Sequence, residues 1–211
     1  GLPDIVFTAN AGLVLGKKAV VSRFRTVERQ GEEKFDHEWF SQNGFDIVDW
    51  PQDVPFEGAG DALFDRGQEL LWVGHGFRSH ASVPALLEKM LGVKTAALNL
   101  VDPRFYHLDT CLCPLANGYM LYFPQAFDDV SRALIETHVA ADGRIAVEEA
   151  DALQFCCNAV DLDGHVFMNG ASEALQNRLK RAGFTPVLTP LSEFMKAGGG
   201  AKCLTLKLVE A

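Results

Sequence analysis

The hydrophobic pattern of the chain repeats with a period of about fifty residues. Short apolar, alternating stretches begin at polar-to-apolar junctions that are separated by 51, 50, 47 and 45 residues. These junctions are Asn10-Ala11, Asp61-Ala62, Cys111-Leu112, Asn158-Ala159 and Cys203-Leu204. A glycine-containing turn signal follows each of the first four stretches, so the pattern predicts strand, tight turn, strand in each unit.

A helix and a third strand are predicted after each hairpin. The candidate helices span roughly 34–43, 83–92, 127–137 and 171–182, and the last has apolar residues at helical spacing and ends at Gly183. Short strands are expected at 45–49, 95–100, 145–147 and 184–188. Units of this size bury both faces only by packing in an array or in a closed ring.

In a ring, equivalent positions of successive units converge on the axis. The residues at or near the junctions are polar or reactive although their surroundings are apolar: Asn10, Glu57 with Asp61, His107 with Asp109, Asn158 and Cys203. A purely structural repeat would place the same small or apolar residue there each time, so this pattern indicates a functional site on the axis.

Composition narrows the class of protein. With 211 residues and 48% hydrophobic content, the chain is long enough for one domain with a substantial core. The net charge of −9 disfavours a nucleic-acid surface and is compatible with a cationic small-molecule substrate. No apolar run is long enough to predict a membrane span. Five cysteines, an odd number, predict free thiols in a reducing cytoplasm.

Two alternative kinds of site are disfavoured by spacing. Cys111, Cys113 and the Cys156-Cys157 pair could join His107 around zinc, but their spacing is not that of paired C-x-x-C ligands. The glycine-rich segment 196–205 lacks the Gly-Lys-Ser/Thr ending of a phosphate-binding loop. We therefore expect no metal and no phosphate cofactor.

A cysteine and a histidine far apart in sequence are a candidate nucleophile and base. Read as a strand, the segment around His107 places His107 and Asp109 on one face. A core histidine beside a turn carboxylate fits the periodicity equally well. A papain-like peptidase is disfavoured because its cysteine comes early and at a helix N-terminus, whereas Cys203 comes late and is expected to open a strand.

Glu57 and Asp61 bracket two glycines, which would let two carboxylates approach a ligand closely. A solvated acidic turn is the alternative. Together with Asp109, however, they make three carboxylates at junctions, and a guanidinium is the cation whose planar N–H groups match carboxylates best. The residues thus predict a cysteine hydrolase or transferase that acts on a guanidinium-like substrate.

Five motifs in this order resemble the guanidino-group-modifying superfamily, which includes arginine deiminases, dimethylarginine dimethylaminohydrolases and amidinotransferases, and the resemblance is closest to the arginine dihydrolases. The motifs are Phe7-Thr-Ala-Asn-Ala-Gly, Phe56-Glu-Gly-Ala-Gly-Asp, Gly76-Phe-Arg-Ser, Phe105-Tyr-His-Leu-Asp-Thr and Gly199-Gly-Ala-Lys-Cys-Leu-Thr. The resemblance implies an α/β fold, a five-bladed propeller of ββαβ repeats. Residues 1–211 would form its single catalytic domain, with the first blade missing or incomplete and the N-terminus truncated relative to the family.

The resemblance also implies roles for individual residues. Cys203 would be the nucleophile and His107 the general acid and base, while Glu57 and Asp109 would hold the guanidinium. The glycines at 198–200 would give clearance to a planar substrate.

Four further residues are expected around the substrate. Arg78 would pair with the substrate's α-carboxylate, and Arg29 matches a second carboxylate-binding arginine. Asp61 would support the site. Asn10 stands where deiminases carry an acid and dihydrolases carry asparagine, and its amide can hold either a guanidinium or an uncharged ureido group.

The expected activity is arginine dihydrolase, which converts arginine to ornithine, ammonia and carbon dioxide without a cofactor. Dimethylarginine dimethylaminohydrolase, arginine deiminase and a non-catalytic amino-acid-binding propeller are the alternatives. The expected partner is a small molecule, with no nucleic acid and no membrane, and a homo-oligomer is left open.

Overall fold

The computed structural model describes residues 1–209, which contain four three-stranded sheets in chain order. The strands are β1 Gly12–Leu15, β2 Lys18–Val21, β3 Asp46–Ile47, β4 Ala62–Phe64, β5 Leu71–His75, β6 Thr95–Asn99, β7 Leu112–Leu115, β8 Tyr119–Tyr122, β9 Arg144–Ala146, β10 Val160–Leu162, β11 His165–Met168 and β12 Thr185–Leu188. In each sheet the first two strands form an antiparallel hairpin, and the third is parallel to the second.

A helix precedes the third strand of every sheet, which confirms the predicted ββαβ unit. These helices are α2 Glu33–Gln42, α3 Val83–Leu91, α4 Asp129–His138 and α6 Glu173–Arg181. Three shorter helices are α1 Val27–Gln30, α5 Glu149–Ala152 and α7 Ser192–Met195. None of the helices in residues 1–209 is both long and apolar enough to cross a membrane.

Local sequence explains where the helices begin and end. The side chain of Asp128 accepts a hydrogen bond from the backbone N–H of Ser131 at the start of α4, and Ser172 caps α6 in the same way through Leu175. The helix α3 ends at Gly92, whose φ of 75° is the left-handed conformation that glycine adopts at helix ends.

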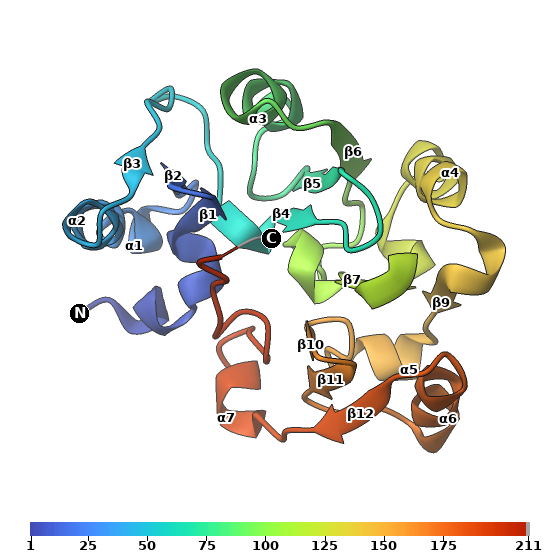
Figure 1. Ribbon diagram of the computed structural model, residues 1–211. Coiled ribbons are helices and arrows are strands. Elements are labelled where there is room, and N and C mark those ends of the chain that lie inside the picture. Colours follow the sequence, from blue (N-terminus) through green and yellow to red (C-terminus); the bar gives the residue numbers. More distant parts are fainter. Residues whose placement is uncertain (210–211) are drawn as a thin grey trace.

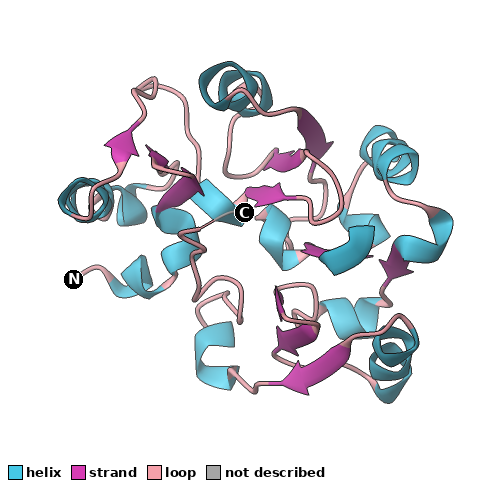
Figure 2. Ribbon diagram, viewed as in Figure 1, coloured by secondary structure: helices cyan, strands magenta, loops and turns pink. Residues whose placement is uncertain are grey.

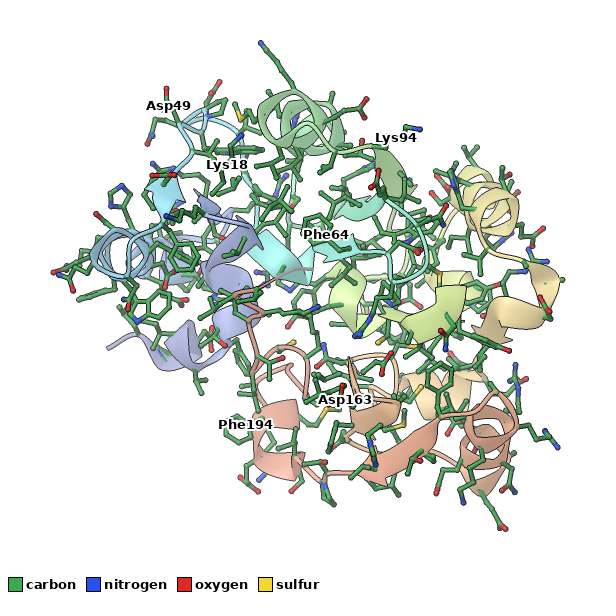
Figure 3. The ribbon with its side chains drawn as sticks, viewed as in Figure 1. Lys18, Asp49, Phe64, Lys94, Asp163 and Phe194 are labelled. Atoms are coloured by element: carbon green, nitrogen blue, oxygen red, sulfur yellow. The ribbon has the colours of Figure 1, made fainter. Side chains whose placement is uncertain are left out.

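The four units follow one another around a common centre (Figure 1). Their helices lie on the outside (Figure 2), and β7 contacts both β4 and β10. Phe64 of β4 lies near the middle of the view in Figure 3, whereas Asp49 and Lys94, which flank third strands, lie toward the edge. The first strand of each unit is therefore the inner one.

The second sheet is buried on both faces. Leu71 and Trp72 are adjacent on β5 and fully buried, and alternation along a strand turns them to opposite sides. Leu71 packs with Leu13 and Phe56 in one hydrophobic cluster, while Trp72 packs in another with Leu112. The continuous apolar run Leu71-Trp72-Val73 in β5 is the sequence signature of this two-sided burial.

The prediction of a strand around His107 is wrong. Residues Leu108–Thr110 form a 3-10 turn, in which the backbone N–H and the hydroxyl of Thr110 both donate to the carbonyl of His107. Similar turns, Thr8–Ala11 and Gly58–Gly60, precede β1 and β4. The expectation that Cys203 opens a strand is also wrong, because residues 201–204 form a turn and no strand follows within 205–209.

Candidate active site

A buried carboxylate, Glu57, lies between two basic side chains, His107 and Arg78. Its Oε2 lies 2.6 Å from Nε2 of His107 and 3.1 Å from Nη1 of Arg78, and its Oε1 accepts a hydrogen bond from the backbone N–H of Arg25. Burial alone would raise the pKa of Glu57, but His107 and Arg78 outweigh it and lower this pKa to about 2. Glu57 is therefore ionised at neutral pH.

His107 is buried next to three carboxylates. Burial opposes its charged form, but Asp61, Glu57 and Asp109 outweigh that effect and raise the pKa of the imidazole. Because Glu57 is ionised, Nε2 of His107 carries a proton and donates it to Oε2. The arrangement favours an imidazolium, which is a proton donor close to neutral pH.

Cys203 lies almost fully buried against Asp109 and Asn158. Its Sγ is 3.5 Å from Oδ2 of Asp109 and accepts a hydrogen bond from Nδ2 of Asn158 at 3.1 Å. Burial and the Asp109 carboxylate raise the pKa of the Cys203 thiol well above its ordinary value. The resting thiol is therefore protonated and donates to Asp109, and a nearby cation is needed to favour the thiolate.

Asp109 offers a free acceptor next to the thiol. Its Oδ1 is buried and has no hydrogen-bond partner within residues 1–209. Burial raises the pKa of the Asp109 carboxyl, against the opposing effect of His107. An unpaired buried carboxylate oxygen is costly unless a ligand supplies N–H donors, so this oxygen marks the place where a cationic ligand is best accommodated.

Asp61 joins the second unit to the turn that carries His107. Its Oδ2 accepts from the backbone N–H and the hydroxyl of Ser79, and its Oδ1 accepts from the backbone N–H of Leu108 at 3.0 Å. Burial raises the pKa of Asp61 to about 6. Both oxygens are thus engaged by the protein itself, in keeping with a supporting position.

Asn10 and Arg29 contact each other and other protein groups. Nη1 of Arg29 donates to Oδ1 of Asn10 at 2.8 Å, and Nδ2 of Asn10 donates to the backbone carbonyl of Glu57. Arg29 also forms a buried ion pair with Glu32, with Nη2 and Oε2 2.8 Å apart. The side chain of Arg78 is more accessible, and its Cζ lies 4.6 Å from the centroid of the Tyr106 ring.

Sequence reasoning noticed Asn158 at the fourth junction but assigned it no role. Its place in the repeat was the signal that could have found it, because the other junctions carry the remaining polar groups of the site. Ser79, Glu32 and Tyr106 gave no such signal. Tyr106 donates to the distant Gly198 carbonyl, whereas Ser79 bonds Asp61 within its own unit and Glu32 pairs with Arg29 three residues away.

The three glycines before Cys203 make room for the protein's own side chains. A Cβ at Gly198, where φ is 86°, would meet the hydroxyl of Tyr106, and one at Gly199 would meet the ring of Phe7. A Cβ at Gly200 would lie 2.9 Å from Oδ1 of Asn158. The clearance that we expected for a planar substrate is thus already required by packing of the loop itself.

The remaining thiols lie outside this arrangement. The four cysteines 111, 113, 156 and 157 are buried and free. Sγ of Cys113 lies 3.3 Å from the carbonyl of Ala159, and Cys156 and Cys157 contact each other at 3.9 Å. Within residues 1–209, no group of three or more His, Cys, Asp or Glu side chains is placed to hold a metal ion.

Comparison with known proteins identifies relatives along the whole chain. Residues 1–210 match the family described as N,N dimethylarginine dimethylhydrolase, eukaryotic. The bifunctional arginine dihydrolase/ornithine cyclodeaminase AgrE of Nostoc sp. is 57% identical over 210 residues, which cover 100% of this chain and 30% of AgrE. The dimethylarginine dimethylaminohydrolase of Mycobacterium tuberculosis is 39% identical over 208 residues, 99% of this chain and 67% of that protein.

Solved structures show the same fold. The N-terminal domain of ArgZ, a cyanobacterial arginine dihydrolase, was solved as a cysteine-to-serine variant bound to substrate; it matches with a TM-score of 0.98 and 54% identity over 100% of this chain and 78% of that one. Another structure of that domain holds a covalently bound reaction intermediate. This chain spans about 30% of the length of AgrE. It belongs to the N,N-dimethylarginine dimethylhydrolase family.

Proposed function

We propose that this chain is an arginine dihydrolase domain that hydrolyses the guanidino group of arginine through Cys203. The observation that carries this proposal is the unpartnered Oδ1 of Asp109 beside the Cys203 thiol. An N–H group of a guanidinium that donates to this oxygen brings its central carbon close to Sγ. The names of AgrE and of the ArgZ domain state this activity. The sequence identity of this chain to both proteins supports arginine as its substrate.

Substrate binding exchanges one ion pair for two. In the structure, Arg78 and Glu57 contact each other. Arginine carries both a guanidinium, which suits Glu57, and an α-carboxylate, which suits Arg78. The substrate guanidinium takes the place of Arg78 on Glu57, and the substrate carboxylate takes the place of Glu57 on Arg78. Neither Glu57 nor Arg78 is therefore left without an ionic partner.

The chemistry follows from the charges around the thiol. A guanidinium between Asp109 and Glu57 supplies the cation that favours the Cys203 thiolate. The thiolate attacks the guanidinium carbon, the C–N bond breaks, and the His107 imidazolium gives its proton to the departing ammonia. His107 then takes a proton from water, whose oxygen attacks the same carbon. The C–S bond breaks, the hydroxyl proton of the adduct passes to solvent, where it protonates the released ammonia, and the thiolate and citrulline are set free.

A second round on the uncharged ureido group completes the dihydrolase reaction. Its sum is arginine plus two waters to ornithine, two ammonia and carbon dioxide. The amide of Asn10, which both donates and accepts, suits a neutral ureido group better than a carboxylate would.

The proposal includes a five-bladed propeller, to which each of the four sheets in residues 1–209 contributes one blade. A cavity of about 340 Å³ is lined by residues of β1, β4, β7 and β10 together with Lys202, Thr205, Leu206 and Lys207. We therefore assign residues 203–207, which begin at the fifth junction, to the innermost segment of a fifth blade. A cytoplasmic location belongs to the same proposal and is supported by the five free thiols.

One experiment tests the activity. Full-length protein is incubated with arginine, and ornithine, citrulline and ammonia are quantified. The proposal predicts ornithine with two equivalents of ammonia, whereas citrulline as the end product would indicate a deiminase. The Mycobacterium relative favours a second candidate, dimethylarginine hydrolysis, which predicts inert arginine and turnover of dimethylarginine.

A further inference from the structure

We propose that Asn158 is a positioning residue for the nucleophile, which fixes the loop that carries Cys203 and favours ionisation of its thiol. This inference deepens the proposed function and rests on the cysteine chemistry described there. The side chain of Asn158 is fully buried, at the fourth junction of the repeat. It reaches across to a loop 45 residues further along the chain.

The hydrogen bonds fix the orientation of the Asn158 amide. Its Oδ1 accepts from two backbone N–H groups, those of Gly200 at 3.0 Å and Cys203 at 3.2 Å. Only the oxygen can face two donors, so Nδ2 is the atom that faces the thiol. Its two hydrogens point to Sγ of Cys203 and to the backbone carbonyl of Asp109 at 3.0 Å.

No smaller or charged side chain reproduces this set of bonds. Asparagine supplies two acceptor sites and two donors in one plane, and all four are used here. Aspartate has the same shape but turns an acceptor toward both Sγ and the Asp109 carbonyl. Serine and alanine are too short to bridge the loop. The backbone carbonyl of Asn158 adds a contact from the N–H of Lys202 at 3.3 Å.

Gly200 leaves room for the hydrogen bonds of the Asn158 amide. A Cβ there would lie 2.9 Å from Oδ1 of Asn158, closer than side chains tolerate. The third glycine of the loop therefore allows the Gly200 N–H to approach the amide. The glycine and the asparagine act together, although they come from different units.

The hydrogen bond from Asn158 to Sγ and the Asp109 carboxylate have opposite effects on the ionisation of Cys203. The Asp109 carboxylate favours the protonated thiol, which can donate to it, whereas the N–H of Asn158 favours the thiolate, which can only accept. A hydrogen bond to a charged group corresponds to about one to two units of pKa. Loss of this donor therefore shifts ionisation of Cys203 to higher pH.

The test is the pH dependence of Cys203 alkylation by iodoacetamide in the full-length protein, followed by peptide mass spectrometry. Asn158→Asp is expected to raise the midpoint by at least one pH unit and to lower kcat for arginine at least about 100-fold, with KM within about threefold. Asn158→Ala serves if the aspartate variant does not fold, and is expected to raise the midpoint by about one to two units.

The matched control is Asn169→Asp. Asn169 also bridges two backbone groups, the carbonyl of Gln154 and the N–H of Leu191, but within residues 1–209 it has no thiol partner. It is expected to lower the Tm without moving the midpoint. An alkylation profile of the Asn158 variants that superimposes on the parent, measured below their Tm, would overturn the proposal. Alkylation needs no arginine, so a protein that is inert to arginine yet shows the shift contradicts only the proposed function.

Discussion

Glu57 and His107 form a hydrogen bond of 2.6 Å in the buried centre of the site. The same Glu57 oxygen also contacts Arg78, so one carboxylate balances two cations. This shared oxygen links the proton donor of the proposed reaction to the group that would bind the substrate's carboxylate.

Replacing Glu57 by glutamine is expected to weaken the proton donor. Without the carboxylate charge, the pKa of His107 falls, because Glu57 is one of the groups that raise it against burial. The alkaline limb of the pH profile of kcat/KM should move to lower pH, and kcat should fall about 100- to 1000-fold. Glu33→Gln, which removes the partner of Arg23 instead, is the control. An unchanged pH profile would refute this role.

Arg78→Ala is expected to affect only substrates that carry a carboxylate. Losing a charge-assisted hydrogen bond should raise KM for arginine about 10- to 100-fold. Agmatine, which has the guanidinium but no carboxylate, should be turned over equally by the parent and the variant. Arg104→Ala, at an exposed arginine, is the control. An equal loss of activity on arginine and on agmatine would show that Arg78 does not bind the substrate's carboxylate.

Arg29→Met is expected to destabilise the fold, since it leaves Glu32 buried without its partner. Breaking a buried pair in this way costs about 3–5 kcal/mol, or roughly 10 °C in Tm. The double variant Arg29→Met/Glu32→Leu should recover part of the loss. If Tm is unchanged and KM for arginine rises instead, Arg29 is a substrate-binding residue, as the family resemblance implies.

Asp36 should make stability depend on pH. It lies in an apolar groove with Phe40 and Leu208, and burial raises its pKa to about 7. The folded protein therefore binds this proton more tightly than the unfolded chain does, so the stabilisation is complete below about pH 4 and is lost as pH rises through about 7.

Asp36→Asn removes the cost of the buried charge. Allowing for its partial exposure, we expect a gain of about 1–2 kcal/mol at pH 8, a few degrees in Tm, and none at pH 4. Thermal unfolding at both pH values measures it, with the exposed Asp46→Asn as control. A gain of equal size at pH 4 and pH 8 would show that Asp36 does not titrate between them.

The repeat could be predicted because each unit is specified locally. The turn signals at Gly16 and Gly164 and the apolar spacing of 171–182 predict hairpins and a helix from neighbouring residues alone, and the structure contains them within about two residues. The prediction of a strand around His107 was also wrong for a local reason. Thr110 binds back to the His107 carbonyl, and periodicity does not report such a turn.

The partners within the site could not be predicted in the same way. The Asp61 contact to Leu108 and the Asn158 contacts to the Cys203 loop join separate units. Their distances depend on how the units pack around the centre. Motif order identified which residues gather there, but it did not identify which atoms meet.

The most direct test of the account is Cys203→Ser. A serine hydroxyl in this buried place is far harder to ionise than a thiol, so we expect turnover of arginine to fall at least about 10⁴-fold. Calorimetric binding of arginine should stay within a few-fold of the parent, and Cys111→Ser, at a buried thiol that donates to the backbone carbonyls of His107 and Leu108, should remain active. Undiminished turnover by Cys203→Ser would contradict the assignment of Cys203 as the nucleophile.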